Sequence, residues 1–300
     1  MQKQSILKEV WPNFFIVGAP KAGTTSLFEY VKEIPGIYMS PKKEPYYFCR
    51  KMIPDYHYVP PIRDKQKYLS LFSNVTNEKI VGEASVWYLS DPDSAKLIHK
   101  VSPDAHILIC LRDPVERTFS HYLFLQHFLE PTLHEQLKKE LKKGVDYSTP
   151  HIRINAGLYY ESVKRYLELF GKDKVKVIIF EEFIRDTQGT VNEILKFLGL
   201  EETELKINSK AYNVYSRRVP RGKISQKILQ RKMAKKIVRS FIPSSGRRFI
   251  ENKILKKKTT NKPNMTEQDR EFLINYFKED VKKIQILLNK KLPWKNFSHL

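Results

Sequence analysis

The chain has 300 residues, among which 54 Lys and Arg outnumber 33 Asp and Glu, so the formal net charge is +21. Aromatic residues make up 12% of the sequence, so we expect a substantial core, and the length suffices for one large or two small domains. A charge of this size attracts polyanions such as nucleic acid, acidic glycans or anionic lipid surfaces. With only Cys49 and Cys110, a disulfide framework is not indicated, and Cys110 lies in an apolar run typical of a buried free thiol.

The sequence contains no apolar run that approaches the roughly 18 residues of a membrane span, and no signal peptide opens it. We therefore expect no transmembrane segment and a soluble, cytoplasmic protein of a reducing compartment. A luminal location is the alternative if an anchoring segment lies outside this sequence.

The first strong pattern combines a strand, a tight loop and the start of a helix. Residues 14–17 are a hydrophobic run that predicts a buried strand, and Gly18 and Gly23 bracket the loop that follows. Three residues that can cap a helix running to about residue 31 come next: Thr24, Thr25 and Ser26. Backbone N–H groups and the positive end of a helix favour an anion, so we predict a phosphate-binding loop.

This loop resembles the Gly-x-x-x-x-Gly-Lys-Ser/Thr phosphate loop of nucleoside triphosphatases, with one departure. Thr24 stands where those enzymes carry lysine, and the lysine lies inside the loop, at Lys21. From there a lysine can reach a bridging oxygen on a bound phosphate. The pattern therefore favours a donor other than ATP; the alternative is an ordinary turn between a strand and a helix.

A carboxylate stands on a proline-interrupted loop after the short strand predicted at residues 37–39. The prolines of residues 40–48 prevent a continuous helix, so Glu44 lies on a loop among lysines and aromatic residues. A carboxylate on such a loop can act as a general base. The alternative is a solvated surface carboxylate.

Strands alternate with helices through the middle of the chain. We predict further strands at residues 80–83, 105–111 and 174–180. The predicted helices are residues 65–72, 91–101, 114–128, 132–143, 158–170, 191–198, 224–238 and 267–289. This alternation is typical of an α/β fold with a parallel sheet covered by helices on both faces.

The strongest predicted strand, residues 105–111, runs directly into Arg112. Asp113 at the N-cap, Pro114 at the first helical position and Glu116 near the start form a helix-initiating pattern. Ligands of open α/β sheets bind at the carboxyl ends of strands, so Arg112 and Ser120, two turns into this helix, are candidate ligand-binding residues. The alternatives are a salt bridge at the sheet edge for Arg112 and a tolerated helical serine for Ser120.

The composition shifts sharply in residues 216–258, which carry 16 Lys and Arg and the single acid Glu251. Residues 138–143 form a second basic cluster. One hypothesis is that these segments hold a polyanionic or membrane-presented acceptor; the alternative is solubility or attraction to anionic membranes. We interpret residues 1–300 as one domain, with an α/β core at 14–200, a basic region at 201–262 and a C-terminal helix at 263–300.

Three segments together resemble the sulfotransferases that use 3′-phosphoadenosine-5′-phosphosulfate (PAPS). Residues 17–27 look like their 5′-phosphosulfate loop, and residues 111–122 look like their 3′-phosphate-binding segment. Residues 43–48, KEPYYF, resemble the Lys-Glu-Pro-His-Phe-Phe block of heparan sulfate sulfotransferases. The resemblance, to the heparan sulfate and bacterial branch, covers most of residues 14–200. It implies a P-loop-like parallel sheet between helices.

The resemblance implies transfer of a sulfuryl group from PAPS, which leaves the product PAP, to a hydroxyl or amine of an acceptor. Arg112 and Ser120 would hold the 3′-phosphate, and Glu44 would be the base. The residues implied for the 5′-phosphosulfate are Lys21, Ala22, Gly23, Thr24, Thr25 and Ser26. A segment that would close over the nucleotide includes Tyr212, Arg217, Arg221 and Gly222. Because Lys21 and the helix end would neutralise the leaving group, no metal is expected.

Two departures lie on the acceptor side. Ala84 stands where glycan sulfotransferases often carry lysine, and Tyr46 replaces their histidine, so the acceptor is not identified beyond an anionic glycan as one candidate. Some sulfotransferase branches use a histidine base, and His57, His121 and His151 are the alternatives to Glu44.

Two other function classes remain as alternatives. A P-loop nucleotide kinase is disfavoured by Thr24 in the lysine position and by the lack of an obvious acidic magnesium site. A basic protein that binds nucleic acid is suggested by the net charge, but the sequence contains no recognised nucleic-acid motif, so we expect no nucleic-acid partner. Peripheral contact with a membrane is compatible with the basic segments.

Overall fold

The structure, a computed structural model, describes residues 9–51, 61–125, 129, 132–144, 151–202, 204 and 264–300, with the backbone alone at 217–220 and 256–259. Several sequence predictions fall outside these residues. They are the predicted helix 224–238 and the site candidates His57, Tyr212, Arg221 and Gly222.

A five-stranded parallel sheet forms the centre of the fold, in the order β2-β3-β1-β4-β5. The strands are β1 (Phe14–Gly18), β2 (Ile37–Met39), β3 (Ile80–Ala84), β4 (His106–Leu111) and β5 (Val175–Ile179). Every residue of β1 and β3 is buried, as expected for strands covered on both faces. Because β1 pairs with β3 on one side and β4 on the other, the loops that follow these three strands meet at one edge.

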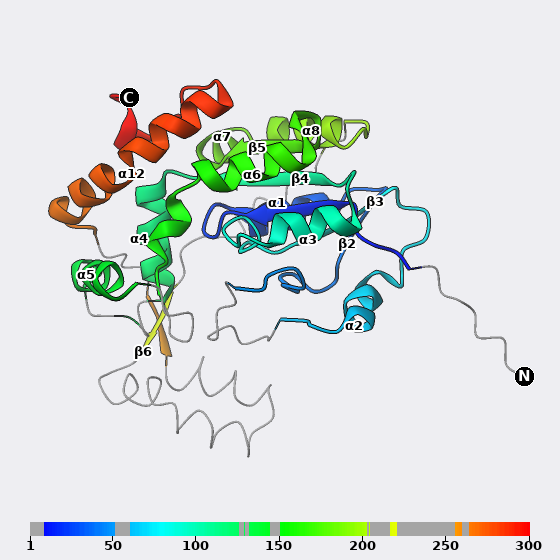
Figure 1. The fold of residues 1–300 in the computed structure, drawn as a ribbon, viewed down its shortest axis with the longest axis horizontal. Helices are drawn as coiled ribbons and strands as arrows, with labels where there is room; N and C mark the ends of the chain where they lie inside the picture. The colour runs from blue at the N-terminus through cyan, green and yellow to red at the C-terminus, as the bar shows by residue number, and fades with distance from the viewer. Residues whose placement is uncertain are drawn as a thin grey trace, which may run out of the picture.

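Helices lie on either side of the sheet (Figure 1). The crossovers from β1 to β2 and from β3 to β4 run in opposite directions, so their helices cover opposite faces. Accordingly α1 packs with α8, and α3 packs with α6. The helices of the core are α1 (Thr24–Lys32), α2 (Lys65–Leu69), α3 (Ser94–Val101), α4 (Pro114–Leu125), α5 (Leu133–Lys143), α6 (Tyr160–Phe170), α7 (Phe180–Arg185) and α8 (Thr187–Phe197).

The sequence predicted most of these elements, with three main differences. The helix predicted at 91–101 begins only at Ser94, because the Asp91 side chain accepts the N–H groups of Asp93 and Ser94 and forms a turn first. The helix α7 was not predicted; its first residue, Phe180, was assigned to the preceding strand. The helix predicted at 191–198 begins earlier, at Thr187, because the Asp186 side chain caps it by accepting the N–H of Gly189. Short 3₁₀ helices occur at Ser70–Phe72, Ile154–Gly157, Lys172–Lys174 and Lys295–Phe297.

The basic region contributes a two-stranded antiparallel ribbon. Its strands are β6 (Arg217–Pro220) and β7 (Lys256–Thr259), with Arg217 opposite Thr259. The pairing was not predicted from the sequence, since neither segment shows strand-like alternation. It brings the two ends of the basic region together, and the position of the Arg217 side chain is not described.

The C-terminal helix α12 (Glu267–Leu288) packs against α4 and α6. Thr266 caps it by accepting the N–H of Asp269. Its buried stripe is Leu273, Phe277, Val281 and Ile284. Phe272 lies outside this stripe: its side chain is 38% exposed, and its ring stacks with that of Tyr276.

One side chain of α12 completes the start of another helix. Both oxygens of Asp280 accept from the first N–H groups of α6, at 2.7 Å from Tyr159 and 3.2 Å from Tyr160. These N–H groups lack partners inside their own helix, so Asp280 supplies the cap that the local sequence does not. The C-terminal helix is therefore part of the core α/β structure rather than an appendage.

We predict that Asp280→Ala lowers the free energy of unfolding by about 1–2 kcal/mol, because it leaves two N–H groups of α6 without their acceptor. Glu279→Ala is the matched control, since this neighbouring carboxylate pairs only with Lys282 at the surface within the part of the chain that is described. Urea denaturation measures both variants. Equal losses in the two variants would contradict the capping role.

Candidate functional site

The predicted phosphate loop leaves the sheet at its carboxyl edge. It connects β1 to α1, and the N–H of Ala19 donates to the carbonyl of Cys110 in β4, at 2.7 Å. Lys21 has a φ of 70° and Gly23 a φ of 83°. Positive φ is disfavoured for a lysine, so the loop holds Lys21 in a strained conformation that the surrounding contacts must stabilise.

Gly23 begins the helix, where the sequence had suggested a hydroxyl cap from Thr24, Thr25 or Ser26. This prediction is wrong: Gly23 is the N-cap residue, in the left-handed region, with no side-chain cap, and the three hydroxyl residues lie in the first turn. A Cβ at Gly23 would lie 2.7 Å from the ring of Phe180, so only glycine fits. The first N–H groups of α1 therefore keep their capacity to bind an anion.

Arg112 lies where β4 ends and contacts this loop directly. Its Nη1 donates to the carbonyl of Lys21 at 3.1 Å, and its guanidinium lies 4.7 Å from the centre of the Phe180 ring. Its Nε is buried without a hydrogen-bond partner, and within the described part of the chain Arg112 forms no ion pair. Arg112 therefore does not form the sheet-edge salt bridge considered as its alternative role. Its guanidinium retains N–H donors that can bind an anion beside the loop.

Lys21 lies in a cationic environment. Its Nζ is 4.3 Å from the centre of the Phe124 ring, an aromatic side chain that is 61% exposed. The pKa of Lys21 is lowered to about 8, chiefly by burial and then by the positive charges of Arg112 and Lys43, while the Glu44 carboxylate opposes this shift. Two positive neighbours around a buried ammonium are unfavourable without an anion, so this pKa shift is typical of an anion-binding site.

The loop that carries Glu44 is fastened to β3, next to β1 in the sheet. The N–H of Ser40 donates to the carbonyl of Gly82, and the N–H of Glu44 donates to the carbonyl of Ala84, both at 2.8 Å. The Glu44 carboxylate bonds Lys43 Nζ at 2.9 Å, with its side chain 23% exposed. Glu44 is therefore not a freely solvated surface carboxylate, because its backbone is fixed at the same sheet edge as Lys21 and Arg112.

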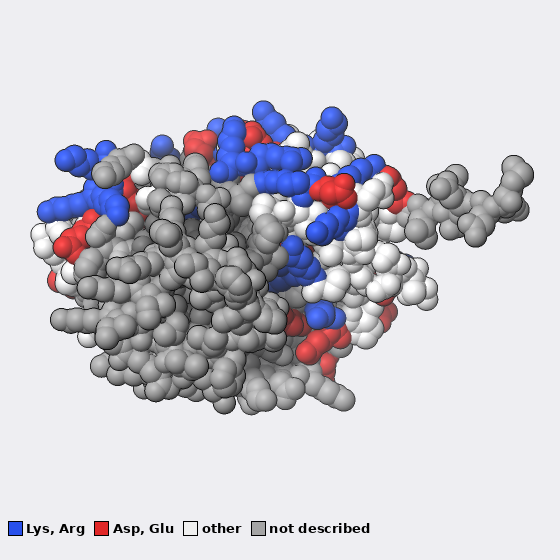
Figure 2. Space-filling model, turned by 90° about the horizontal axis from the view of Figure 1, so that it is seen from below, with Lys and Arg blue, Asp and Glu red and all other residues white. Residues whose placement is uncertain are grey.

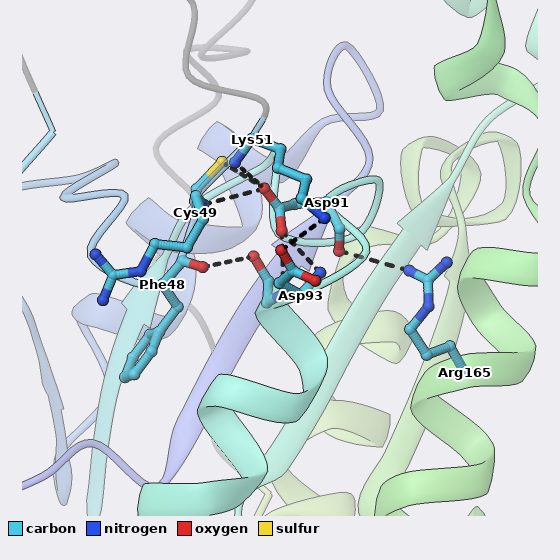
Figure 3. Close-up of polar contacts among 8 residues, drawn as sticks. Phe48, Cys49, Lys51, Asp91, Asp93 and Arg165 are labelled. Carbon is cyan, nitrogen blue, oxygen red and sulfur yellow. Dashed lines mark hydrogen bonds and ion pairs between the residues drawn. The ribbon is translucent and has the colours of Figure 1, made fainter.

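A buried carboxylate holds the far end of the Glu44 loop (Figure 3). Asp91 Oδ2 accepts the backbone N–H groups of Arg50 and Lys51, at 3.1 and 2.8 Å, and the thiol of Cys49 at 3.4 Å. Its Oδ1 accepts the N–H groups of Asp93 and Ser94. Asp91 thus joins residues 49–51 to the start of α3, so the loop is anchored at both ends.

The other predicted site residues differ in how well the structure supports them. Ser120 is half-buried on α4, on the helix that begins directly after Arg112. His121 is buried, bonds the carbonyl of Ile152 at 2.7 Å, and has its pKa lowered well below the usual value by burial and by Arg117. His151 is buried beside Glu140, at 3.5 Å. Both histidines are buried in the α4–α5 region, so neither is the accessible group that a base requires.

Four residues that the sequence analysis did not single out support the site. Phe180 lies between Gly23 and Arg112, and Phe124 contacts Lys21. The Tyr159 hydroxyl donates to the carbonyl of Arg112 at 2.8 Å, and Glu181 accepts the N–H of Asp113 at 3.1 Å. Phe180 and Glu181 directly follow β5, so the strand-end argument used for Arg112 could have found them; nothing local indicates Tyr159 or Phe124.

The described residues contain no group of three or more His, Cys, Asp and Glu placed to hold a metal ion. None of the helices among them is both long and apolar enough to span a bilayer. The prediction that Cys110 is a buried free thiol is confirmed, and Cys49 is likewise buried and forms no disulfide.

The chain matches the sulfotransferase domain over residues 12–285 and belongs to the sulfotransferase family. A crystal structure of a sulfotransferase from Alicyclobacillus acidocaldarius is 33% identical, with a TM-score of 0.68 over 94% of this chain and 98% of that chain. The predicted fold, a parallel sheet between helices of sulfotransferase type, is thereby confirmed.

Curated relatives include longer proteins that act on glycans. Rat carbohydrate sulfotransferase 15 is 26% identical over 245 residues, which cover 63% of this chain and 44% of that protein. Human heparan sulfate glucosamine 3-O-sulfotransferase 6 is 27% identical over 194 residues, which cover 64% of this chain and 53% of that protein. The chain therefore spans about half the length of these relatives.

We predict that Lys21 titrates near pH 8 and that its pKa depends on both neighbours. Glu44→Gln should lower the pKa further, because it removes the negative charge that favours the ammonium, and Arg112→Gln should raise it. NMR titration of ¹³C-methylated lysines, with Lys21 assigned by its loss in Lys21→Arg, measures these shifts. A Lys21 pKa near 10.5 that neither variant moves would contradict the described arrangement.

Proposed function

We propose that this protein transfers a sulfuryl group from PAPS to a hydroxyl or amine of an acceptor, most simply a glycan. The observation that carries the proposal is the meeting of Lys21, Arg112 and Glu44 at the ends of β1, β4 and the loop fastened to β3. This arrangement places two cations for an anionic donor beside one carboxylate that can accept a proton.

The residues at the loop fit such a donor. The Arg112 guanidinium, whose Nε has no partner, and the first N–H groups of α1, which no side chain caps, can donate to phosphate or sulfate oxygens. Lys21 and the amides of residues 22–26 would hold the 5′-phosphosulfate, and Arg112 and Ser120 the 3′-phosphate. PAPS supplies the activated sulfuryl group when bound; Lys21 stabilises negative charge that develops on its phosphate.

Glu44 fits the role of general base. The carboxylate is partly exposed and lies close enough to Lys21 to raise the pKa of that ammonium, so an acceptor reaching Lys21 also reaches Glu44. The carboxylate accepts a hydrogen bond from Lys43 Nζ at 2.9 Å, and a carboxylate is a group that can take the proton of an acceptor hydroxyl. The chemistry assigned to these residues needs no metal, because Lys21 and the N-terminal end of α1 would provide the positive charge at the leaving group.

A polyanionic glycan is the acceptor class that the charge of the chain favours. Among the described residues of the face shown in Figure 2, Lys and Arg side chains gather along one edge and beside the centre, with Asp and Glu side chains among them. Lys138, Lys139 and Lys142 are also exposed on α5. Names of two relatives, a carbohydrate sulfotransferase and a heparan sulfate sulfotransferase, point to the same class. The cytoplasmic location, the single domain and membrane contact stay predictions.

We predict that Arg112→Ala weakens the binding of PAP much more than the binding of 5′-AMP, which lacks the 3′-phosphate. The reason is that charge-assisted hydrogen bonds to this phosphate disappear with the guanidinium. Calorimetric titration of both nucleotides measures the difference. Lys138→Ala, an exposed lysine of α5, is the matched control and should change neither affinity. Equal weakening of PAP and 5′-AMP by Arg112→Ala would refute the 3′-phosphate assignment.

The transfer itself is tested with ³⁵S-labelled PAPS and a panel of glycans and small alcohols. We predict that Glu44→Gln binds PAP normally but loses about 10²-fold or more in kcat, because the amide cannot accept the acceptor proton. Glu33→Gln, an exposed glutamate beyond α1, should retain full activity. An active Glu44→Gln alongside an inactive His121 variant would reassign the base, and no transfer by the wild-type protein would refute the proposed function.

A further inference from the structure

A second buried carboxylate lies under the Glu44 loop and has no part in the chemistry proposed so far. Glu83 is fully buried in β3, one residue before the end of the strand. Burial raises its pKa to about 7, while hydrogen bonds from Ser85, Tyr68 and Tyr88 favour its ionised form. Burying a carboxyl group here is costly, so its retention needs a reason beyond packing.

Three hydroxyl groups donate to this carboxylate. Tyr68 and Tyr88 both donate to Oε1, at 2.8 and 2.9 Å, and Ser85 donates to Oε2 at 2.7 Å. A hydroxyl that gives its single proton to a carboxylate keeps only lone pairs for its other neighbours. Glu83 therefore turns each of these hydroxyls into an acceptor of fixed direction.

Two of the three hydroxyls use their lone pairs to hold the Glu44 loop. The N–H of Tyr46 donates to Ser85 Oγ at 3.2 Å, and the N–H of Phe48 donates to the Tyr88 hydroxyl at 3.2 Å. The third hydroxyl, that of Tyr68, bonds Glu83, and the described residues give it no bond to an N–H of the loop. The Glu83 carboxylate is thus connected through two hydroxyls to two backbone N–H groups of the loop, one directly before Tyr47 and one directly after it.

The loop needs this support, because its backbone is strained. Glu44 has a φ of 63° and Tyr46 a φ of 54°, both in the left-handed region that non-glycine residues avoid. Such residues persist only where the surroundings over-determine them. The two amides held by the network lie two and four residues after Glu44, so they fix the direction in which the loop leaves it.

We propose that Glu83 is a positioning residue for Glu44, acting through Ser85 and Tyr88 on the backbone of residues 46–48. The inference rests on the proposed function for the role of Glu44 as base. Removing the network should move the carboxylate relative to the acceptor and leave the donor site intact, since Lys21 and Arg112 are held by other contacts. A displacement on the order of 1 Å can cost up to about 10²-fold in rate.

The sharpest test compares Tyr88→Phe with Tyr68→Phe. Both changes remove one buried hydroxyl that donates to Glu83 and keep the ring. Of these two tyrosines, only Tyr88 also accepts a backbone N–H of the loop. We expect Tyr88→Phe to lower kcat about tenfold or more and Tyr68→Phe to lower it no more than about threefold. The affinity for PAP, measured by calorimetry, should stay within about twofold in both variants. Glu83→Gln should behave like Tyr88→Phe if it folds.

Two further measurements separate positioning from a merely structural role. In the Glu44→Gln background, Tyr88→Phe should cause little additional loss of kcat, because the network acts through Glu44. Hydrogen exchange at the Phe48 amide should accelerate in Tyr88→Phe and not in Tyr68→Phe. Equal loss of kcat in the two tyrosine variants, full additivity with Glu44→Gln, or unchanged exchange at Phe48 would overturn the proposal.

Failure of the proposed function gives a different pattern. A wild-type protein that transfers nothing from PAPS, while exchange at the Phe48 amide still responds to Tyr88→Phe alone, would refute sulfuryl transfer and with it the role of Glu83 in positioning a base. An active wild-type protein in which Tyr88→Phe and Tyr68→Phe are equally active would refute only the inference about Glu83.

Discussion

The hydrogen bond from Arg112 to the carbonyl of Lys21 joins two adjacent strand ends, and the rest of the site depends on it. Each partner is placed by the sheet: β1 leads into the loop and β4 leads into Arg112, side by side in parallel register. Because an arginine side chain bonds a backbone carbonyl here, the loop and the guanidinium keep a fixed relation before any ligand arrives. A preorganised pair of this kind spends less free energy on ordering when an anion binds.

This arrangement has an electrostatic cost in the absence of a ligand. Lys21, Arg112 and Lys43 bring three cations to one place, and the pKa of Lys21 is lowered first by its burial and then by these two positive neighbours. Backbone strain adds to it, since Lys21, Glu44 and Tyr46 all have positive φ. Both costs are offset by buried anchors underneath, among which Asp91 and Glu83 hold the loop of Glu44 from two directions. The site is thus strained where a ligand binds and rigid below it.

The sequence predicted the sheet and the placement of Lys21, Glu44 and Arg112 because each follows a strand whose apolar residues are unmistakable. It did not predict what lies beneath them. Asp91 accepts from residues 40 or more positions away. Glu83 acts on the loop through Ser85 and Tyr88, whose loop partners lie 39 and 40 positions away, and no local pattern reveals such pairings. The cap of α1 was misassigned for a related reason: hydroxyl residues fit an N-cap, but a tight fit against Phe180 selects Gly23. The partners of the two buried carboxylates and the N-cap of α1 all depend on contacts between residues far apart in the sequence.

The C-terminal segment shows the same principle over the largest sequence separation among the hydrogen bonds of the described residues. Asn296 donates to Asp113 Oδ2 at 2.8 Å, and Trp294 Nε1 donates to Glu181 Oε2 at 3.1 Å. Glu181 in turn accepts the N–H of Asp113, the residue directly after Arg112. Burial raises the pKa of both carboxyls, and the donors from residues 294–296 are what make two neighbouring acids tolerable there. The turn that follows Arg112 is therefore completed by residues about 180 positions later in the chain. These bonds explain why the segment after α12, with Trp294, contributes to a site built on a parallel sheet.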